Sequence, residues 1–102
     1  EKGEVIMQPG LEKRIVSKIM RKLKARKDCY CFKVHGGLYT AGQPDIIGCL
    51  AGRAFGLEVK VPGCKPTVLQ EHTLECWRQA GAIAAVVHSW EEAREVLGLD
   101  ED

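Results

Sequence analysis

The chain contains 102 residues, of which 45% are hydrophobic and 28% are charged, and 15 basic against 14 acidic side chains leave a formal net charge of +1. This length and composition are typical of one small globular domain and exclude intrinsic disorder and collagen-like repeats. No apolar run reaches the roughly 20 residues of a membrane helix, and residues 1–8 lack the pattern of a secretion signal, so we expect a cytoplasmic domain with no membrane partner.

Residues 11–27 are predicted to form an amphipathic helix, because their apolar side chains recur at helical spacing. This helix contributes to a strong charge asymmetry. Residues 1–33 hold ten basic and four acidic side chains, a net charge of +6, whereas the remaining 69 residues have a net charge of −5. Such a division predicts a polyanionic partner on one face of the fold. A solvated helix surface is the alternative interpretation.

Residues 29–34 alternate in the manner of a half-buried strand, with Cys29 and Cys31 two positions apart. The chain has five cysteines, an odd number in a sequence without secretory features, so no disulfide framework is expected. Zinc and iron–sulfur sites usually contain cysteine pairs separated by two residues, and this pair is separated by one. We therefore expect structural thiols, with a metal site as the alternative.

Two further strands, over residues 45–51 and 54–60, are predicted after a glycine-rich loop that ends at Pro44. Gly52-Arg53 lies between them and predicts a two-residue hairpin turn with glycine at its first central position. The register of this hairpin decides which polar side chains meet at its open end.

In that predicted register Asp45 lies opposite Lys60, and Asp45 and Glu58 are diagonal neighbours about 7–8 Å apart at Cα. Two carboxylates at such a distance repel each other unless one is protonated or both share a cation. A set of oxygen ligands favours Mg²⁺ or Mn²⁺ over zinc. Lys60 lies beside the pair, where its ammonium group can orient a water molecule or contact a phosphate oxygen.

The last third of the chain is predicted to form a helix, a strand over residues 82–88 and a second helix. Both helices have bounding residues: the capping boxes Thr67-x-x-Gln70 and Ser89-x-x-Glu92 at their starts, and Gly81 and Gly98 at their ends. The element order is then αβββαβα. This order predicts an α/β fold with a mixed central sheet flanked by helices.

Two further polar residues have patterns that allow more than one role. Helical spacing puts Glu12 in the middle of the apolar stripe of the first helix, where a carboxylate is costly unless it is paired or binds a metal. Its alternative role is that of a first-turn acid favoured by the helix dipole. Gln70 shares a face with Leu74 and Trp77 and can reach inward, or it can serve only as a capping residue.

Gly42-Gln43-Pro44-Asp45 followed after a hairpin by Glu58-Val59-Lys60 resembles the motif of PD-(D/E)XK nucleases. Pro62, and Gln70 followed by Trp77 and Gly81, resemble the VRR-NUC (virus-type replication-repair nuclease) branch of that superfamily. The resemblance extends from Glu12 to about Leu97. It implies a restriction-endonuclease-like core and one VRR-NUC domain over residues 1–102.

The resemblance also implies a metal site. Asp45 and Glu58 would bind the catalytic Mg²⁺ or Mn²⁺, and the backbone carbonyl of Val59 would be a further ligand. Glu12 would complete the acidic cluster, directly or through water. Such a cation lowers the pKa of a water molecule and neutralises charge on the scissile phosphate.

Two other residues acquire catalytic roles from the resemblance. Lys60 would position the attacking water and stabilise the charged transition state. Gln70 would orient Lys60 or a phosphate. The expected reaction is metal-dependent hydrolysis of phosphodiester bonds in DNA.

DNA contacts are predicted for polar residues that flank this site, because polar side chains near a cleft often bind the sugar–phosphate backbone. These residues are Lys33, His35, Tyr39, Thr40, Gln43 and Lys65. For His35 a loop histidine without such a role is the alternative.

Short chains of the VRR-NUC branch resemble phage-type Holliday junction resolvases, which implies a homodimer acting on branched DNA in a bacterial or phage-infected cell. Two alternatives remain: a non-catalytic DNA-binding module of the same fold, and the nuclease domain of a larger repair or restriction enzyme. The presence of Asp45, Glu58 and Lys60 favours an enzyme over the first alternative.

Overall fold

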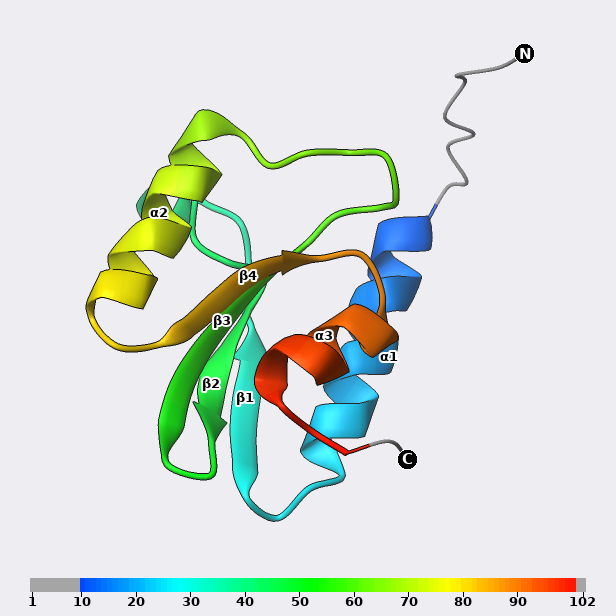
Figure 1. Cartoon of the computed structure of the whole chain (residues 1–102). Coiled ribbons are helices and arrows are strands. Elements are labelled where there is room, and N and C mark those ends of the chain that lie inside the picture. The colour runs from blue at the N-terminus through cyan, green and yellow to red at the C-terminus, as the bar shows by residue number, and fades with distance from the viewer. Residues whose placement is uncertain (1–9, 101–102) are drawn as a thin grey trace.

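The structure is a computed structural model that describes residues 10–100, and its elements follow the predicted order αβββαβα (Figure 1). The elements are α1 (Leu11–Lys24), β1 (Cys29–Lys33), η1 (Leu38–Thr40), β2 (Ile46–Leu50), β3 (Arg53–Val59), α2 (Val68–Gln79), β4 (Ile83–Val87) and α3 (Trp90–Leu97). The 3₁₀ turn η1 was not predicted and lies in the glycine-rich loop. Between residues 10 and 100, no helix has the length and apolar character needed to cross a membrane.

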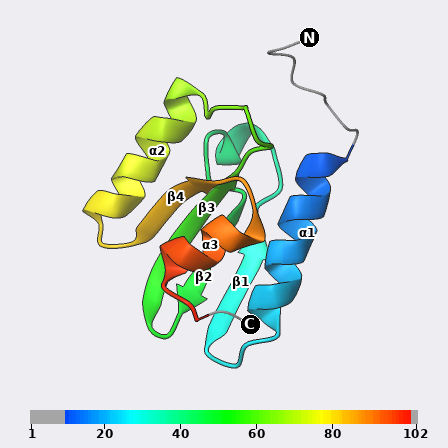
Figure 2. The ribbon, with the colours of Figure 1, turned by 45° about the vertical axis from the view of Figure 1, so that its right-hand side comes forward.

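The four strands form one mixed sheet in the order β1-β2-β3-β4, which confirms the predicted α/β class. β1, β2 and β3 are antiparallel neighbours, and β4 returns through α2 to lie parallel to β3. α1 and α3 contact each other on one side of the sheet, and α2 covers β3 and β4 from the other side (Figures 1 and 2). The C-terminal end of β3 is therefore enclosed by both helical layers.

The hydrophobic core lies between the α1–α3 layer and the sheet. Its larger members come from five elements: Val16, Ile19 and Leu23 of α1, Ile46 and Leu50 of β2, Phe55, Leu57 and Val59 of β3, Val87 of β4, and Trp90 and Leu97 of α3. Burying one such side chain stabilises the fold by roughly 1.5–3 kcal/mol. Because side chains alternate along a strand, Gly56 and Glu58 of β3 face the opposite layer, toward α2.

The hairpin turn differs from the predicted one by one residue. Leu50 pairs with Arg53, so the two turn residues are Ala51 and Gly52, with φ angles of 51° and 88°. Positive φ at both positions is the type I′ geometry, which matches the twist of the flanking strands. The prediction of Gly52-Arg53 was wrong because it assigned glycine to the first turn position, whereas the strands place it at the second.

The alternating cysteines of β1 are structural, as the sequence predicted. Cys31 is buried, and its Sγ lies 4.0 Å from Met20 Sδ of α1. Burial raises the pKa of Cys31, and burial together with the adjacent Cys31 thiol raises the pKa of Cys29 to about 12. Thiols with raised pKa values are poor nucleophiles at neutral pH, because the thiolate is the reactive form.

The helix ends follow the predicted capping residues, with two corrections. The Thr67–Gln70 capping box of α2 is complete. At α3 the Ser89 side chain accepts from Glu92 N, but the Glu92 carboxylate accepts from the backbone N–H of His88 instead of closing a box on Ser89. α1 ends at Lys24, earlier than predicted, and Arg26 beyond its end pairs with Asp28 in the following turn.

Candidate active site

Asp45 and Glu58 face each other at the open end of the β2–β3 hairpin. The register pairs Ile46 with Leu57, and continuing it by one residue puts Asp45 directly opposite Glu58. The predicted register, with Lys60 opposite Asp45, was wrong by two residues. Directly opposite residues of a non-hydrogen-bonded pair have Cα atoms about 4.5 Å apart, so the correction brings the carboxylates closer than the predicted diagonal did.

Backbone and packing contacts fix the Asp45 side chain. Its Oδ2 accepts a hydrogen bond from the backbone N–H of Val59 at 2.8 Å. Pro44, which is fully buried, packs on Gly56 of β3, where an added Cβ would lie 2.9 Å from the proline Cγ. The missing side chain of Gly56 therefore lets the chain before Asp45 approach β3 closely, and Asp45 is held at the strand end.

The same geometry leaves the backbone carbonyl of Val59 without a ladder donor. Continuing the register by two residues puts Pro44 opposite Val59. In an antiparallel ladder the N–H and C=O of one residue point toward the same neighbour, and proline has no N–H to donate. The Val59 carbonyl is thus directed to the same side as Asp45, as a metal ligand requires.

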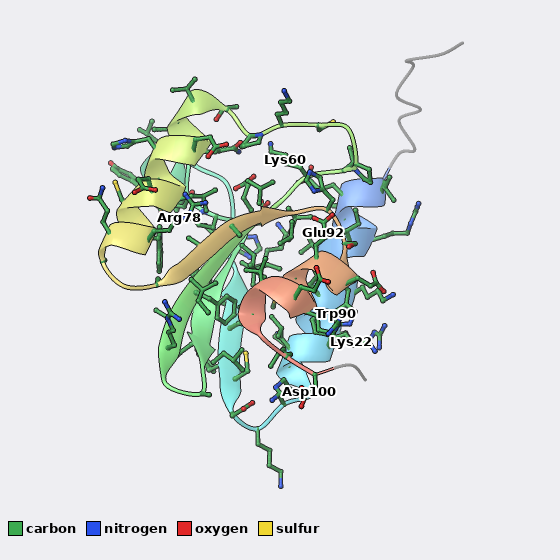
Figure 3. The ribbon with its side chains drawn as sticks, viewed as in Figure 1. Lys22, Lys60, Arg78, Trp90, Glu92 and Asp100 are labelled. Carbon is green, nitrogen blue, oxygen red and sulfur yellow. The ribbon has the colours of Figure 1, made fainter. Side chains whose placement is uncertain are left out.

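Lys60 completes the group at the end of β3. Its Nζ lies 3.7 Å from Glu58 Oε2, and the two side chains are 19% and 3% exposed. Because Lys60 lies two residues after Glu58, both side chains project from the same side of the strand. Figure 3 shows Lys60 near the loop that leads from β3 to α2, at the upper end of the sheet. The amine is therefore partly open to solvent, while the carboxylate beneath it is enclosed.

The environment of Glu58 favours its protonated form in the absence of a cation. Burial and the adjacent Asp45 carboxylate raise the pKa of Glu58 to about 8, although the Lys60 ammonium group acts in the opposite direction. A side-chain hydrogen bond with Asp45 and the charge of Glu12 raise this pKa further. Titratable groups with strongly displaced pKa values in a cleft are typical of functional sites.

The donor set fits a hard divalent cation. Glu58 Oε1 is buried and has no hydrogen-bond partner among residues 10–100, which is an unusual cost for a carboxylate oxygen. Two carboxylates and one backbone carbonyl supply oxygen ligands only, the chemistry that Mg²⁺ and Mn²⁺ prefer. No group of three or more His, Cys, Asp or Glu side chains within the described residues is close enough to hold a metal ion, so the acidic centre is the pair itself.

Glu12 lies near this pair but is not part of it. Its charge influences Glu58, yet its side chain is exposed at the first turn of α1. The predicted burial in the apolar stripe was wrong, because angular position on a helix does not determine depth where the helix extends beyond the sheet. Its role as a metal ligand remains a prediction.

Gln70 is held at the start of α2. Its side-chain oxygen accepts a hydrogen bond from the backbone N–H of Thr67 at 2.8 Å, and the backbone N–H of Gln70 donates to Thr67 Oγ1 at 3.1 Å. The capping role is therefore confirmed. The side-chain NH₂ group is not needed for the capping box, and its predicted catalytic role remains a prediction.

The residues predicted to bind DNA differ in exposure and in their contacts, and Gln43 is both exposed and internally bonded. Lys33, His35, Tyr39 and Lys65 are exposed, and Tyr39 is 96% accessible on η1. Thr40 and Gln43 make internal contacts. Thr40 Oγ1 donates to His35 O at 2.7 Å, and Gln43 Oε1 accepts from Trp77 Nε1 at 3.2 Å, which ties the loop to α2.

Gly56 is the positioning residue that the sequence interpretation missed. An isolated glycine inside a predicted strand was the available signal, because it often marks close approach of another backbone. Its partner Pro44 lies in the motif itself, but the contact between them depends on the register.

Comparison with known proteins gives the fold. No family model matches the sequence, and no curated protein matches it. A solved structure described as "VRR_NUC domain" is similar over 86% of this chain and 95% of its own, with a TM-score of 0.71 and 25% identity. A second, described as "VRR_NUC domain protein", covers 85% of this chain and 84% of its own, with a TM-score of 0.69 and 21% identity.

The mixed sheet with an acidic pair and a lysine at its hairpin defines an α/β nuclease-fold domain. More specifically, the chain has the VRR-NUC fold, as the sequence resemblance predicted. The resemblance to Holliday junction resolvases remains a prediction.

Proposed function

We propose that this chain is a divalent-metal-dependent endonuclease that hydrolyses phosphodiester bonds in DNA. The observation that carries the proposal is the convergence of Asp45, Glu58 and Lys60: two directly opposed carboxylates, one of them with an unpartnered oxygen, and an amine 3.7 Å away. The VRR-NUC fold of the chain supports the same activity.

Asp45, Glu58 and the Val59 carbonyl would hold Mg²⁺ or Mn²⁺. When bound, such a cation lowers the pKa of a coordinated water and neutralises charge on the scissile phosphate. The protein fixes this ligand set before the cation binds, because the Val59 N–H bond orients Asp45 and burial restricts Glu58. A rigid ligand set of this kind avoids reorganisation during the reaction.

Lys60 would hold the nucleophilic water or a non-bridging phosphate oxygen. Its ammonium group has three donors, and only one is needed for the contact with Glu58. Gln70 would use its NH₂ group to orient the phosphate, and the exposed Glu12 would contact the cation through water.

The proposed substrate is branched DNA, with a four-way junction as the preferred form and a homodimer as the active species. The resemblance to small junction resolvases is the basis of this part. A homodimer suits a four-way junction because paired cuts need two active sites related by a two-fold axis. The exposed residues Lys33, His35, Tyr39 and Lys65 would serve as DNA contacts.

The test is a cleavage assay with end-labelled four-way junction, flap, duplex and single-stranded DNA, each with Mg²⁺, Mn²⁺ or EDTA. We expect cleavage of the junction with either metal and none in EDTA. Asp45→Asn should abolish cleavage but retain junction binding, because it removes charge at the pair. Asp100→Asn makes the same chemical change at an exposed residue and should cleave like the wild-type protein.

Three results would contradict all or part of the proposal. Cleavage by Asp45→Asn at the wild-type rate would remove the assigned site. Junction binding by the wild-type chain without cleavage in either metal would instead support the non-catalytic DNA-binding module. Equal cleavage of all substrates would retain the nuclease and overturn the preference for branched DNA.

A further inference from the structure

A second charged surface lies on α1, outside the candidate active site. The 14-residue helix carries six lysine and arginine side chains and one acid, Glu12. Its inner side is buried through Val16, Ile19 and Leu23, so the basic side chains occupy the outer side. Concentrated positive charge on one side of a helix is a typical footprint of nucleic-acid binding.

The basic side chains surround a hollow on the surface of the helix. This hollow has a volume of about 440 Å³ and is lined by Lys13, Arg14, Ser17, Lys18 and Arg21. Within the described part of the chain no carboxylate lines it, whereas Glu91 and Asp100 line the neighbouring hollows toward α3. An anion in the first hollow would therefore meet only cations and one hydroxyl group.

Two of the four cations that line this hollow lack an ion-pair partner within the described part of the chain. Lys13 and Arg21 have no ion-pair partner among residues 10–100. Lys18 has one, Glu91, at 3.9 Å, with side chains 48% and 69% exposed. Such an exposed pair contributes little and is readily exchanged for a phosphate contact.

Most of this surface lies away from the acidic pair: Glu12 in the first turn of α1 is the part of the helix whose charge influences Glu58, and Lys18 and Arg21 lie about two turns further along the helix. Glu58 faces α2, whereas the α1 side chains project away from the sheet on the opposite layer. Figure 3 shows Lys60 at the upper end of the sheet, whereas Lys22, which lines the neighbouring hollow toward α3, lies near the lower end of α1. A helix of 14 residues is about 21 Å long, which is enough to contact several phosphates of one DNA strand.

We propose that the outer face of α1, centred on Lys13, Lys18 and Arg21, binds the phosphate backbone of a second DNA arm, distinct from the arm held at the acidic pair. This inference rests on the proposed function and deepens it. It gives the preference for branched DNA a physical basis, because only a substrate with two arms occupies both surfaces at once. The binding is to phosphates and carries no base specificity.

The test uses the double variant Lys18→Gln/Arg21→Gln. Its matched control, Lys27→Gln/Arg53→Gln, removes the same charge at two exposed residues near the far end of the sheet, opposite the acidic pair. Fluorescence anisotropy in EDTA measures the Kd of a four-way junction and of a 12-bp duplex at several salt concentrations. Circular dichroism and size-exclusion chromatography with light scattering report folding and association.

We expect the α1 variant to bind the junction on the order of tenfold more weakly near 0.1 M salt, and its slope of log K against log salt to be smaller by about 2. Binding and cleavage of the short duplex should stay at the wild-type level. The control variant should keep the wild-type junction slope.

An unchanged junction slope would overturn the proposal and leave α1 as a solvated surface. If the α1 variant bound the junction and the duplex more weakly by the same factor, the proposal of a second arm would be overturned, because both substrates would then use one surface. Loss of self-association with unchanged DNA affinity would assign the face to a second copy of the chain. A wild-type protein that binds in this way but never cleaves would contradict the proposed nuclease and not the α1 surface.

Discussion

Asp45 Oδ2 accepts a hydrogen bond from the backbone N–H of Val59 at 2.8 Å, so a side-chain carboxylate takes the place of a strand partner at the end of β3. The preceding residue is a proline, which cannot donate to β3, and the ladder ends at Ile46. The Asp45 carboxylate is thereby anchored to the backbone of β3. This relationship explains why the Pro-Asp order matters: proline ends the pairing, and aspartate takes over the free N–H.

The metal-free protein should become less stable as the pH rises from about 4.5 to about 8. The pKa of Glu58 is raised from 4.5 to about 8 in the fold, so the folded chain keeps a proton that the unfolded chain releases in this interval. Stability falls with pH wherever the folded state binds more protons. Thermal melts in EDTA at pH 5, 6, 7 and 8 measure the effect, and each kcal/mol lowers Tm by about 4–8 °C in a domain of this size.

Glu58→Gln isolates that contribution, since the amide keeps the shape and cannot ionise. Its Tm should vary less with pH than the wild-type Tm and should exceed it at pH 8. Glu95→Gln, at an exposed residue of α3, should follow the wild-type profile. Mg²⁺ should raise the wild-type Tm more at pH 8 than at pH 6, because cation binding displaces the proton. Parallel profiles for wild type and Glu58→Gln would refute this account.

Gly56→Ala should disturb the site through Pro44. The new Cβ would lie 2.9 Å from the proline ring, and the chain that carries Asp45 must move away. We expect a loss of about 1–3 kcal/mol in stability from overpacking and a fall in cleavage of up to about 100-fold. Gly36→Ala is the control, because no other side chain or backbone atom lies within 4 Å of the position that its new Cβ would take. Chemical denaturation and single-turnover cleavage give the two values; wild-type cleavage by Gly56→Ala would show that Pro44 does not position Asp45.

Lys60→Met should slow the chemical step by about 10²–10³ with little loss of stability. Methionine keeps much of the aliphatic stem but removes the ammonium group beside Glu58. Loss of a positioned donor of this kind costs about 10²–10³ in rate. Under single-turnover conditions the cleavage rate of Lys60→Met should fall, while its affinity for the junction changes by less than threefold. Lys27→Met serves as the control for the lost charge. A large loss of affinity at an unchanged rate would make Lys60 a binding residue only.

Gln70 can be tested for a role beyond capping. Gln70→Ala removes the side chain that accepts from Thr67 N and should cost about 0.5–2 kcal/mol. Gln70→Glu keeps a capping acceptor at the same position but removes the NH₂ group, so the melting temperature should stay near that of the wild type while cleavage falls. Full cleavage by Gln70→Glu would limit Gln70 to its capping role.

Local patterns predicted most of the fold. The apolar spacing of residues 11–24, the alternation of β1 and the caps at Thr67 and Ser89 all depend on neighbours in the chain. The register of the β2–β3 hairpin was harder to predict from the sequence. The predicted and observed registers differ by two residues, so both put the same side chains on the same face of the sheet.

Packing between large and small residues selects the observed register. Phe55 lies opposite Gly48, where an added Cβ would lie 2.3 Å from the Tyr30 carbonyl oxygen, and Pro44 lies against Gly56. These contacts join residues from three segments. No pattern within one segment encodes them, and for this reason the direct opposition of Asp45 and Glu58 was missed.

The amino-acid sequence alone determined which side chains have the chemistry for a cation and a phosphate, and which stretches become helices and strands, since both follow from residue type and local periodicity. The tertiary structure decided how close those side chains come, how deeply Glu58 and Glu12 are buried, and which side of the molecule the basic helix presents. Depth and distance depend on how separate elements pack, and this is a property of the whole fold.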